Sequence, residues 1–453
     1  MHLKTLTDCG RAAVLALAAL TAGGGVAVAQ DTGRMEQVIR ASVDEGAFTG
    51  AVLVARGDEV LLDRGYGLAN REWNAANDGD TKFRLASVSK QFTAVALMLL
   101  NERGLVDLDA PVKAYLADAP ATWDQVTVRR LLTHTAGLPD FTRAPEYETL
   151  KRQPTTAAAL MKGFRDRPLD FQPGQGWAYS NANYVVATAV IEAVSGASYA
   201  AFVVDNLFAP LGMADSGYDS HDAILPRRAS GYSPADEGVR NADYVDMSAP
   251  QGAGGLYSTA RDLLKWEQGL FGGRLLNPAS LRVLTTPERN GYAMGLAVKT
   301  EGGDVIVSHS GGIEGFNTFM ARDLDDRLTV IVLGNLNGAA PEKIGVSLMT
   351  LARGGSVVLP GEHVAISVAP DVLATYAGAY RLAPGATLTV SVVDGRLMGQ
   401  ATGQQAFELF AEAPDAFFLK AFDAQITFTR GLGGAVEGLV LHQGGRETPA
   451  KRL

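Results

Sequence analysis

The chain has 453 residues and a mass of 47.7 kDa, with 47 % apolar and 20 % charged residues. This composition is globular, and the length exceeds what one hydrophobic core usually supports, so we expect two domains. A net charge of -9 without a basic cluster argues against a nucleic-acid binder, whose affinity would depend on many Lys and Arg contacts to phosphate. The one cysteine, Cys9, excludes an internal disulfide, a thiolate metal cluster and a C-x-x-C redox pair.

Residues 1–29 have the pattern of a secretory signal peptide. A short positive region with Lys4 and Arg11 precedes the apolar stretch A-A-V-L-A-L-A-A-L-T, and A-V-A ends the segment. The apolar run is shorter than the roughly 20 residues of a membrane anchor. We therefore expect cleavage after Ala29, a periplasmic or secreted location, and no stable membrane anchor in the mature chain.

Strands are predicted at both ends of the first domain. Residues 50–69 contain two strand-like runs around the turn signal Gly57-Asp58, which predicts a hairpin. Between residues 303 and 335 three further runs predict an antiparallel meander. One sheet built from both ends of the domain, with helices packed on it, accounts for these runs.

Helices are predicted between these strands. From Ser87 the chain is apolar on nearly all faces until Gly104, which is typical of a buried central helix. A second helix is expected over residues 183–195. A third is expected to begin near Thr259, which fits a capping box with Asp262.

The composition changes after about Arg353. Glycines and prolines predict a linker, and eight short alternating runs follow, separated by turns. A closed antiparallel barrel is the simplest interpretation of these runs, because closure leaves no exposed edge strand. The predicted organisation is a signal peptide over 1–29, an α/β domain over 30–353, a linker over 354–370 and a small all-β domain over 371–453.

The usual motifs of two hydrolase classes are missing. The sequence has no G-x-S-x-G, which α/β hydrolases with a serine, histidine and acid often show. Its six histidines are isolated, without H-x-H or H-E-x-x-H, so we expect no catalytic metal, and we expect no cofactor. Another nucleophile must be sought.

The sequence S-V-S-K over 87–90 is the only S-x-x-K in the chain. Residues three apart share a helix face, so the Lys90 amine can reach the Ser87 hydroxyl. A partly desolvated amine at a helix start favours its neutral form and can accept the serine proton, and free backbone N–H groups there can bind an oxyanion. Taken alone the motif is weak, because Ser and Lys three residues apart on a helix are common by chance, and an ordinary capping serine is the default interpretation of Ser87.

The sequence Y-S-N over 179–181 lies where a Pro- and Gly-rich loop enters a helix. A phenol beside a lysine can relay a proton from the nucleophile to the leaving group, which suits Tyr179. The Asn181 amide can hold both the lysine and a substrate carbonyl. The alternative is a tyrosine that packs its ring at the helix entrance.

The sequence H-S-G-G over 309–312 follows a strand-like run. Gly311 and Gly312 lack Cβ atoms, so a substrate backbone could lie against this strand as an extra strand, beside His309 and Ser310. The Gly312 N–H is a candidate second oxyanion donor. A simple tight turn is the alternative interpretation.

In order and spacing, these three motifs resemble those of class C serine β-lactamases and the related D-alanyl-D-alanine carboxypeptidases and esterases. The resemblance extends to F-R-L-A-S-V-S-K-Q-F-T-A, L-L-T-H-T-A-G-L-P-D, A-G-G-L-Y-S-T-A-R-D-L and S-H-S-G-G-I-E-G-F, and covers about residues 35–350. The tail, with F-E-L-F and D-A-Q-I-T-F, is similar to the lipocalin-like β domain that follows the hydrolase domain in many such proteins.

The resemblance implies a β-lactamase/transpeptidase-like α/β (α+β) fold, in which an antiparallel sheet flanked by helices meets an all-helical region at the active site. It implies that Ser87 is the acylated nucleophile and that Lys90 with Tyr179 provides the base and the acid. Asn181 would position the substrate, and the N–H groups of Ser87 and Gly312 would form the oxyanion hole.

The third motif departs from the β-lactamase form, which has lysine where this chain has His309. An unperturbed histidine, with a pKa of about 6.5, is mostly neutral at pH 7, so the attraction for a β-lactam carboxylate is weaker. The histidine form is found in the D-alanyl carboxypeptidases and several esterase-like relatives. His134 is expected to be a hydrogen-bonded structural residue near the cleft, and Trp177 a packing residue or a cleft wall.

The sequence therefore predicts a secreted serine hydrolase that forms an acyl-enzyme on Ser87. It would cleave a small amide, peptide or ester, in the manner of a D-alanyl carboxypeptidase or esterase, with at most weak β-lactamase action. Its partner would be a small-molecule or peptide substrate and no nucleic acid. The alternative is a non-catalytic penicillin-binding or scaffold protein with the same fold.

Overall fold

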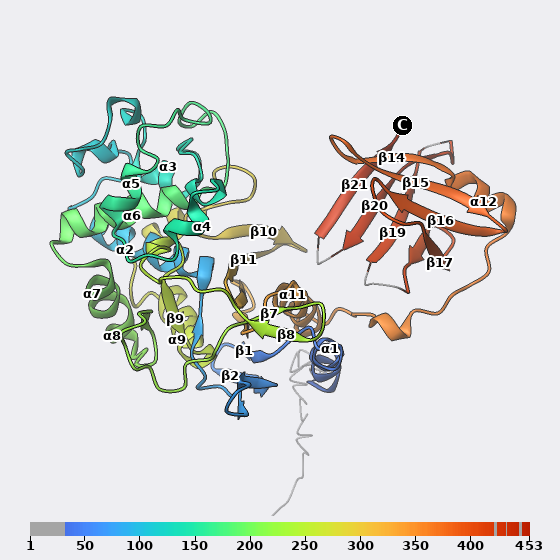
Figure 1. The fold of residues 1–453 in the computed structure, drawn as a ribbon, viewed down its shortest axis with the longest axis horizontal. Coiled ribbons are helices and arrows are strands. Elements are labelled where there is room, and N and C mark those ends of the chain that lie inside the picture. The colour runs from blue at the N-terminus through green and yellow to red at the C-terminus, as the bar shows by residue number, and fades with distance from the viewer. Residues whose placement is uncertain (1–31, 421–423, 432, 444–445) are drawn as a thin grey trace, which may run out of the picture.

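The computed structural model describes residues 32–453 apart from 421–423, 432 and 444–445, so the predicted signal peptide lies outside the described residues. Figure 1 shows two regions joined by a long connection. We call residues 32–353 the sheet region and residues 370–453 the barrel region. The fold of each follows from how its strands bury apolar side chains.

The sheet region contains one six-stranded antiparallel sheet built from both ends of the segment, as predicted. Its order is β10-β11-β12-β13-β1-β2. The predicted hairpin is β1 and β2, and the predicted meander is β11, β12 and β13. The strands are β1 (Gly50–Arg56), β2 (Glu59–Tyr66), β10 (Ala297–Glu301), β11 (Asp304–Ile313), β12 (Phe316–Asp323) and β13 (Leu328–Gly334).

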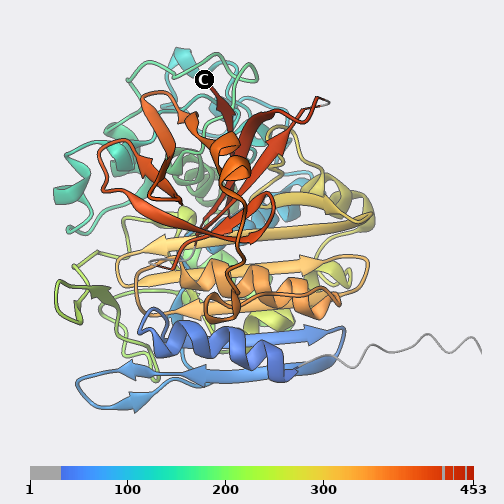
Figure 2. The same cartoon turned by 90° about the vertical axis from the view of Figure 1, so that its right-hand side faces the viewer.

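Both faces of this sheet are covered, because its central strands β1 and β13 are apolar along almost their whole length. Successive side chains of a strand point to opposite faces. Leu53 accordingly joins the core beneath the helical part, and its neighbours Val52 and Val54 join a second core against α1 (Thr32–Asp44) and α11 (Ala340–Ala352). Figure 2 shows α1 and α11 lying across this face.

The other helices gather on the opposite face, around the buried helix α2 (Ser89–Glu102). Twelve of its fourteen residues are buried, as the sequence predicted for a central helix. The remaining helices of the sheet region are α3 (Val128–Leu132), α4 (Tyr147–Leu150), α5 (Ala157–Lys162), α6 (Asn181–Ser195), α7 (Tyr199–Val203), α8 (Ala209–Leu211), α9 (Ala260–Phe271) and α10 (Pro278–Thr285). Short strands connect them: β3 (Leu68–Asn70), β4 (Ala75–Ala76), β5 (Phe83–Arg84), β6 (Gly217–Tyr218), β7 (Tyr232–Pro234), β8 (Val239–Asn241) and β9 (Leu256–Ser258).

Several details differ from the sequence predictions. Helix α6 begins at Asn181, two residues earlier than expected, and helix α1 and strand β10 were not predicted. Thr259 caps α9 by accepting a hydrogen bond from the Asp262 N–H, as expected. The second half of the capping box is wrong, because the Asp262 carboxylate instead accepts hydrogen bonds from Asp215 and Ser216.

The barrel region is a closed barrel of eight antiparallel strands, as predicted. Its first strand pairs with its last, so the sheet has no free edge. A short helix, α12 (Pro370–Tyr376), leads into it. The strands are β14 (Gly378–Ala383), β15 (Ala386–Val393), β16 (Arg396–Ala401), β17 (Phe407–Ala413), β18 (Ala416–Phe418), β19 (Ala424–Arg430), β20 (Val436–Gln443) and β21 (Arg446–Arg452).

The connection between the regions is tied to both. Arg34 of α1 donates to the Val357 carbonyl at 2.6 Å and pairs with Glu362, and Ile366 N–H donates to the Ala411 carbonyl of β17 at 2.7 Å. Within the described residues no single helix is long and apolar enough to cross a membrane; only α6 together with the segment Tyr199–Leu211, bent by 79°, meets that length and composition.

Candidate active site

Ser87 lies in a tight turn, residues 86–88, that precedes α2. The preceding residue, Ala86, has a left-handed backbone with φ of 49°, which a residue with a Cβ adopts only when its surroundings enforce it. Strands β11 and β12 provide that support, because the Thr318 hydroxyl donates to the Leu85 carbonyl at 2.8 Å. A Cβ on Gly311 would lie only 2.4 Å from the same carbonyl oxygen.

This close approach changes the explanation for Gly311. From the sequence, the missing side chain of Gly311 is expected to leave space for a substrate backbone, whereas in the structure it lets β11 pack against the turn that bears Ser87. A substrate backbone could still pair as an added strand with the segment around Ser310. Strand β10 pairs with β11 only as far as Ser308, and no other strand of the described part of the chain pairs with the outer edge of β11 beyond that residue.

Lys90 is fully buried one turn of helix after Ser87. Its Nζ lies 3.0 Å from Ser87 Oγ, 2.9 Å from Asn181 Oδ1 and 2.9 Å from the Ala253 carbonyl oxygen. Burial lowers the pKa of Lys90 to about 7, although the nearby Asp140 carboxylate opposes this shift. A large share of Lys90 is therefore neutral at pH 7.

The partners of Lys90 also orient its lone pair. The Asn181 side-chain oxygen and the Ala253 carbonyl can only accept hydrogen bonds, so a neutral amine gives them its two protons. The third direction, toward Ser87 Oγ, is then occupied by the lone pair. This arrangement can accept the Ser87 proton.

Tyr179 is the second hydrogen-bond partner of Ser87. Burial raises the pKa of the Tyr179 phenol, and its hydrogen bond with Ser87 opposes that shift. Lys90 Nζ lies 4.8 Å from the centre of the Tyr179 ring. The structure thus brings Ser87, Lys90 and a neutral phenol together, as the sequence predicted.

Asn181 is held by a residue that the sequence analysis quoted but did not assign to the site. The Asp140 carboxylate accepts from the Asn181 N–H at 3.3 Å and from its side-chain amide at 3.4 Å, and that amide also donates to Thr142 at 3.2 Å. Asn181 therefore fixes Lys90, as predicted. Its predicted contact with a substrate carbonyl would compete with Asp140 and Thr142.

His309 is neutral and fully engaged with protein groups. Its Nδ1 lies 2.6 Å from the Ser310 carbonyl, which can only accept, so Nδ1 bears the proton and Nε2 accepts from the Tyr292 hydroxyl at 2.8 Å. Burial and the charge of Lys90 lower the pKa of His309 to about 3. This lowered pKa has the direction that the expected lack of a standing positive charge at His309 requires. No signal in the sequence pointed to Tyr292.

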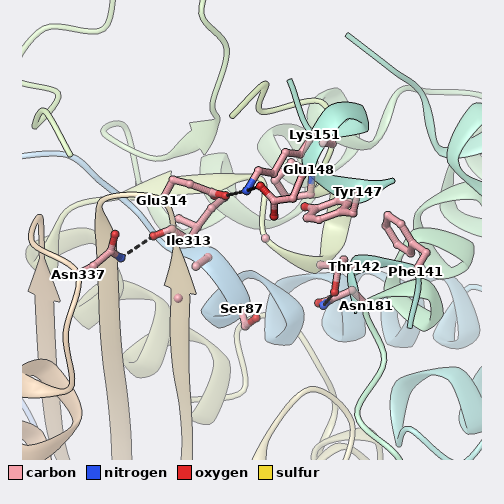
Figure 3. A pocket seen from close by; sticks show the side chains of 16 residues that line it. Ser87, Phe141, Thr142, Tyr147, Glu148, Lys151, Asn181, Ile313, Glu314 and Asn337 are labelled. Atoms are coloured by element: carbon pink, nitrogen blue, oxygen red, sulfur yellow. Dashed lines mark hydrogen bonds and ion pairs between the residues drawn. The ribbon is translucent and has the colours of Figure 1, made fainter. Parts of the chain in front are cut away.

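Two cavities meet at Ser87. One, of about 450 Å³, lies toward the helical part and is lined by Asn181 and by an ion pair between Lys151 and Glu314, 2.7 Å apart (Figure 3). The other, of about 500 Å³, is lined by Tyr179 and the 309–312 segment. Ser87 and Gly312 are the two residues that line both cavities. The two residues predicted to donate the oxyanion hydrogen bonds are therefore the two at this junction.

His134 fixes the backbone on both sides of Tyr179. Its carbonyl accepts from the Ala178 N–H at 3.1 Å, and its Nδ1 accepts from the Ser180 N–H at 3.3 Å. The His134 ring also lies 4.3 Å from the Tyr179 ring, centre to centre. The predicted structural role is confirmed, and Trp177 packs edge-on against His134.

Among the described residues, no group of three or more His, Cys, Asp or Glu side chains could hold a metal ion.

Comparison with known proteins agrees with this geometry. Residues 35–348 match the family described as Beta-lactamase. The chain belongs to this family of serine hydrolases. Residues 362–451 match a domain of unknown function, DUF3471, which corresponds to the barrel region.

The relatives of this β-lactamase-family chain have several activities in their names. Penicillin-binding protein 4* of Bacillus subtilis is 29 % identical over 89 % of this chain and 95 % of its own length. Esterase EstB of Burkholderia gladioli is 36 % identical over 49 % of this chain and 60 % of its own. The crystal structure of D-amino acid amidase from Ochrobactrum anthropi superposes with a TM-score of 0.61 at 26 % identity, covering 71 % of this chain and 99 % of that one.

Proposed function

We propose that the protein hydrolyses small amides or esters through an acyl-enzyme on Ser87. The observation that supports this most directly is the 3.0 Å contact between Ser87 Oγ and a buried Lys90 whose pKa is lowered to about 7. A surface lysine would be protonated and could not serve as a base at neutral pH.

In the proposed acylation, Lys90 accepts the Ser87 proton as Oγ forms its bond to the substrate carbonyl carbon. The resulting oxyanion is held by the N–H groups of Ser87 and Gly312. When the intermediate collapses, the leaving group takes a proton from Tyr179, and Lys90 returns its proton to Tyr179. Water then attacks the ester and passes its proton to the same pair, and Ser87 is reprotonated as it leaves.

The state of His309 favours uncharged substrates over β-lactams. A β-lactam and a carboxypeptidase substrate both have a carboxylate on the leaving-group side, and a neutral His309 provides no attraction for it. Amidase and esterase activity is the finer proposal, and the names of the amidase and esterase relatives support it. A non-catalytic scaffold would not require the amine of Lys90 to be buried beside the Ser87 hydroxyl.

Export is part of the same proposal. The pattern of residues 1–29 supports a cleaved leader, and removal of this segment leaves a chain without cysteine, which suits an oxidising compartment. Determination of the N-terminal sequence of the exported protein tests it, and an N-terminus at Gln30 is the expected result.

Turnover assays with p-nitrophenyl esters, amino-acid amides and nitrocefin test the proposed function. We expect hydrolysis of esters and amides, slow or no turnover of nitrocefin, and loss of at least about 10³-fold in Ser87→Ala with the unfolding temperature almost unchanged. Ser347→Ala, on α11 outside both cavities, is the matched control and should retain full activity. Equal activity of Ser87→Ala and the wild type would reject the nucleophile, and no turnover of any substrate would favour the scaffold alternative.

A further inference from the structure

The two cavities at Ser87 can be assigned to the two halves of a substrate. Tyr179, the proposed proton donor to the leaving group, lines only the 500 Å³ cavity, and Asn181 lines only the 450 Å³ cavity. Because the donor must contact the departing atom, the leaving group occupies the cavity of Tyr179 and the acyl group occupies that of Asn181.

The leaving-group cavity contains a single charge. Among the described residues that line it, Glu342 has the only acidic or basic side chain apart from the imidazole of His309 and the phenol of Tyr179, and burial lowers the pKa of His309 to about 3. The adjacent Lys343 lines a different cavity, between α1 and α11. Among the described residues, no Lys or Arg therefore lines this cavity to balance Glu342.

The Glu342 carboxylate is available to a ligand. It belongs to the first turn of α11 and is partly exposed. None of the residues that the structure describes forms a hydrogen bond or ion pair with it. By contrast, Glu314 in the acyl cavity pairs with Lys151 at 2.7 Å, and the same lysine also pairs with Glu148 of that cavity at 2.7 Å.

We propose that Glu342 determines which leaving groups the enzyme accepts. This inference rests on the proposed function. The preferred substrates are amides or esters whose departing amine or alcohol has a positive charge. Substrates with a carboxylate on the leaving group have a lower kcat/KM. The physical reason is Coulomb attraction or repulsion inside a cavity where no counter-ion competes.

Three acetate esters of similar shape provide the test: those of 3-hydroxyphenyltrimethylammonium, 3-hydroxybenzamide and 3-hydroxybenzoate. They place a positive charge, no charge and a negative charge at the same position of the leaving group. Because their intrinsic reactivities differ, the measured quantity is the kcat/KM ratio of the cationic to the anionic ester, compared between protein variants. The variants are Glu342→Gln, Glu342→Lys and the charge-matched control Glu45→Gln, which alters a different cavity.

We expect the ratio to fall about 3- to 10-fold in Glu342→Gln and further in Glu342→Lys. In the wild type, raising the salt concentration to 1 M should lower the ratio toward the Glu342→Gln value. The neutral benzamide ester should change less than about twofold in Glu342→Gln, and Glu45→Gln should match the wild type. A ratio that stays constant in both Glu342 variants while the neutral ester is hydrolysed would overturn the role of Glu342 alone. No Ser87-dependent hydrolysis of the neutral ester would overturn the proposed function, and this inference with it.

Discussion

The sheet region and the barrel region bury different kinds of side chain. The barrel core consists of aliphatic and aromatic residues, with Tyr376, Tyr380, Phe417 and Phe428 packed at its centre. All the buried polar or charged residues found among the described residues lie between Thr49 and Asn335, in the sheet region. Burial of a polar group lowers the free energy of unfolding unless the group is paired. The sheet region, which contains the candidate active site, therefore bears a stability cost that the barrel region does not.

The largest effects on activity are expected from the proton-transfer pair of the sheet region, Lys90 and Tyr179. Lys90→Ala and Tyr179→Phe should each lower kcat by about 10²- to 10⁴-fold, because each removes one part of a single relay. The double variant should be hardly worse than the more impaired single variant. The exposed Lys162→Ala is the control and should leave kcat unchanged.

Steady-state kinetics on all four variants gives the answer. If the losses in the double variant multiply, the two residues do not act as one unit.

The pH profile provides a second test with a smaller effect. Neutral Lys90 is the proposed base, so kcat/KM should rise with pH through about 7 and fall about tenfold per unit below it. Asp140 raises the pKa of Lys90, so Asp140→Asn should move the inflection to lower pH, by about 1 unit.

The measurement is kcat/KM from pH 5 to 9 on the neutral benzamide ester. A residue with only a structural role would lower the whole curve without moving it. An inflection that stays in place in Asp140→Asn would therefore contradict the electrostatic role of Asp140.

The smallest effect on activity is expected in the barrel core. Phe417 is fully buried against Tyr376 and Phe428, and Phe417→Ala should reduce the barrel's free energy of unfolding by about 3–5 kcal/mol. Both cavities at Ser87 are lined by residues 86–342, so kcat should change less than about twofold. Phe92→Ala is the matched substitution in the sheet region, on α2 against Trp266, and should reduce both stability and kcat.

Calorimetry and kinetics on this pair separate the two regions. A loss of activity in folded Phe417→Ala would show that the barrel takes part in catalysis.

The same contrast explains what the sequence could predict. The spacing of Ser87 and Lys90 is local, and one helical turn is enough to place the amine 3.0 Å from the hydroxyl. The alternating apolar runs of the barrel and the sheet also report burial directly. Asp140 and Tyr292 gave no such signal, because each enters the site only through a tertiary contact, with Asn181 and His309 respectively.

Local sequence patterns also could not explain why a glycine is required at position 311. The sequence singled out Gly311 for its missing side chain, but the required space is occupied by the Leu85 carbonyl of a segment more than 200 residues away. Helix α1 gave no clear periodic signal, because residues 32–44 include only three buried positions, Met35, Val38 and Ile39.

The central claim is that Ser87 becomes covalently acylated during turnover. Rapid acid quench of the wild type with the neutral benzamide ester, followed by intact-mass measurement and peptide mapping, tests it most directly. The account predicts a mass increase of one acetyl group on the peptide that contains Ser87, formed at the rate of the initial release of 3-hydroxybenzamide. Continued turnover with the acetyl group on another residue, or on none at any quench time, would contradict it.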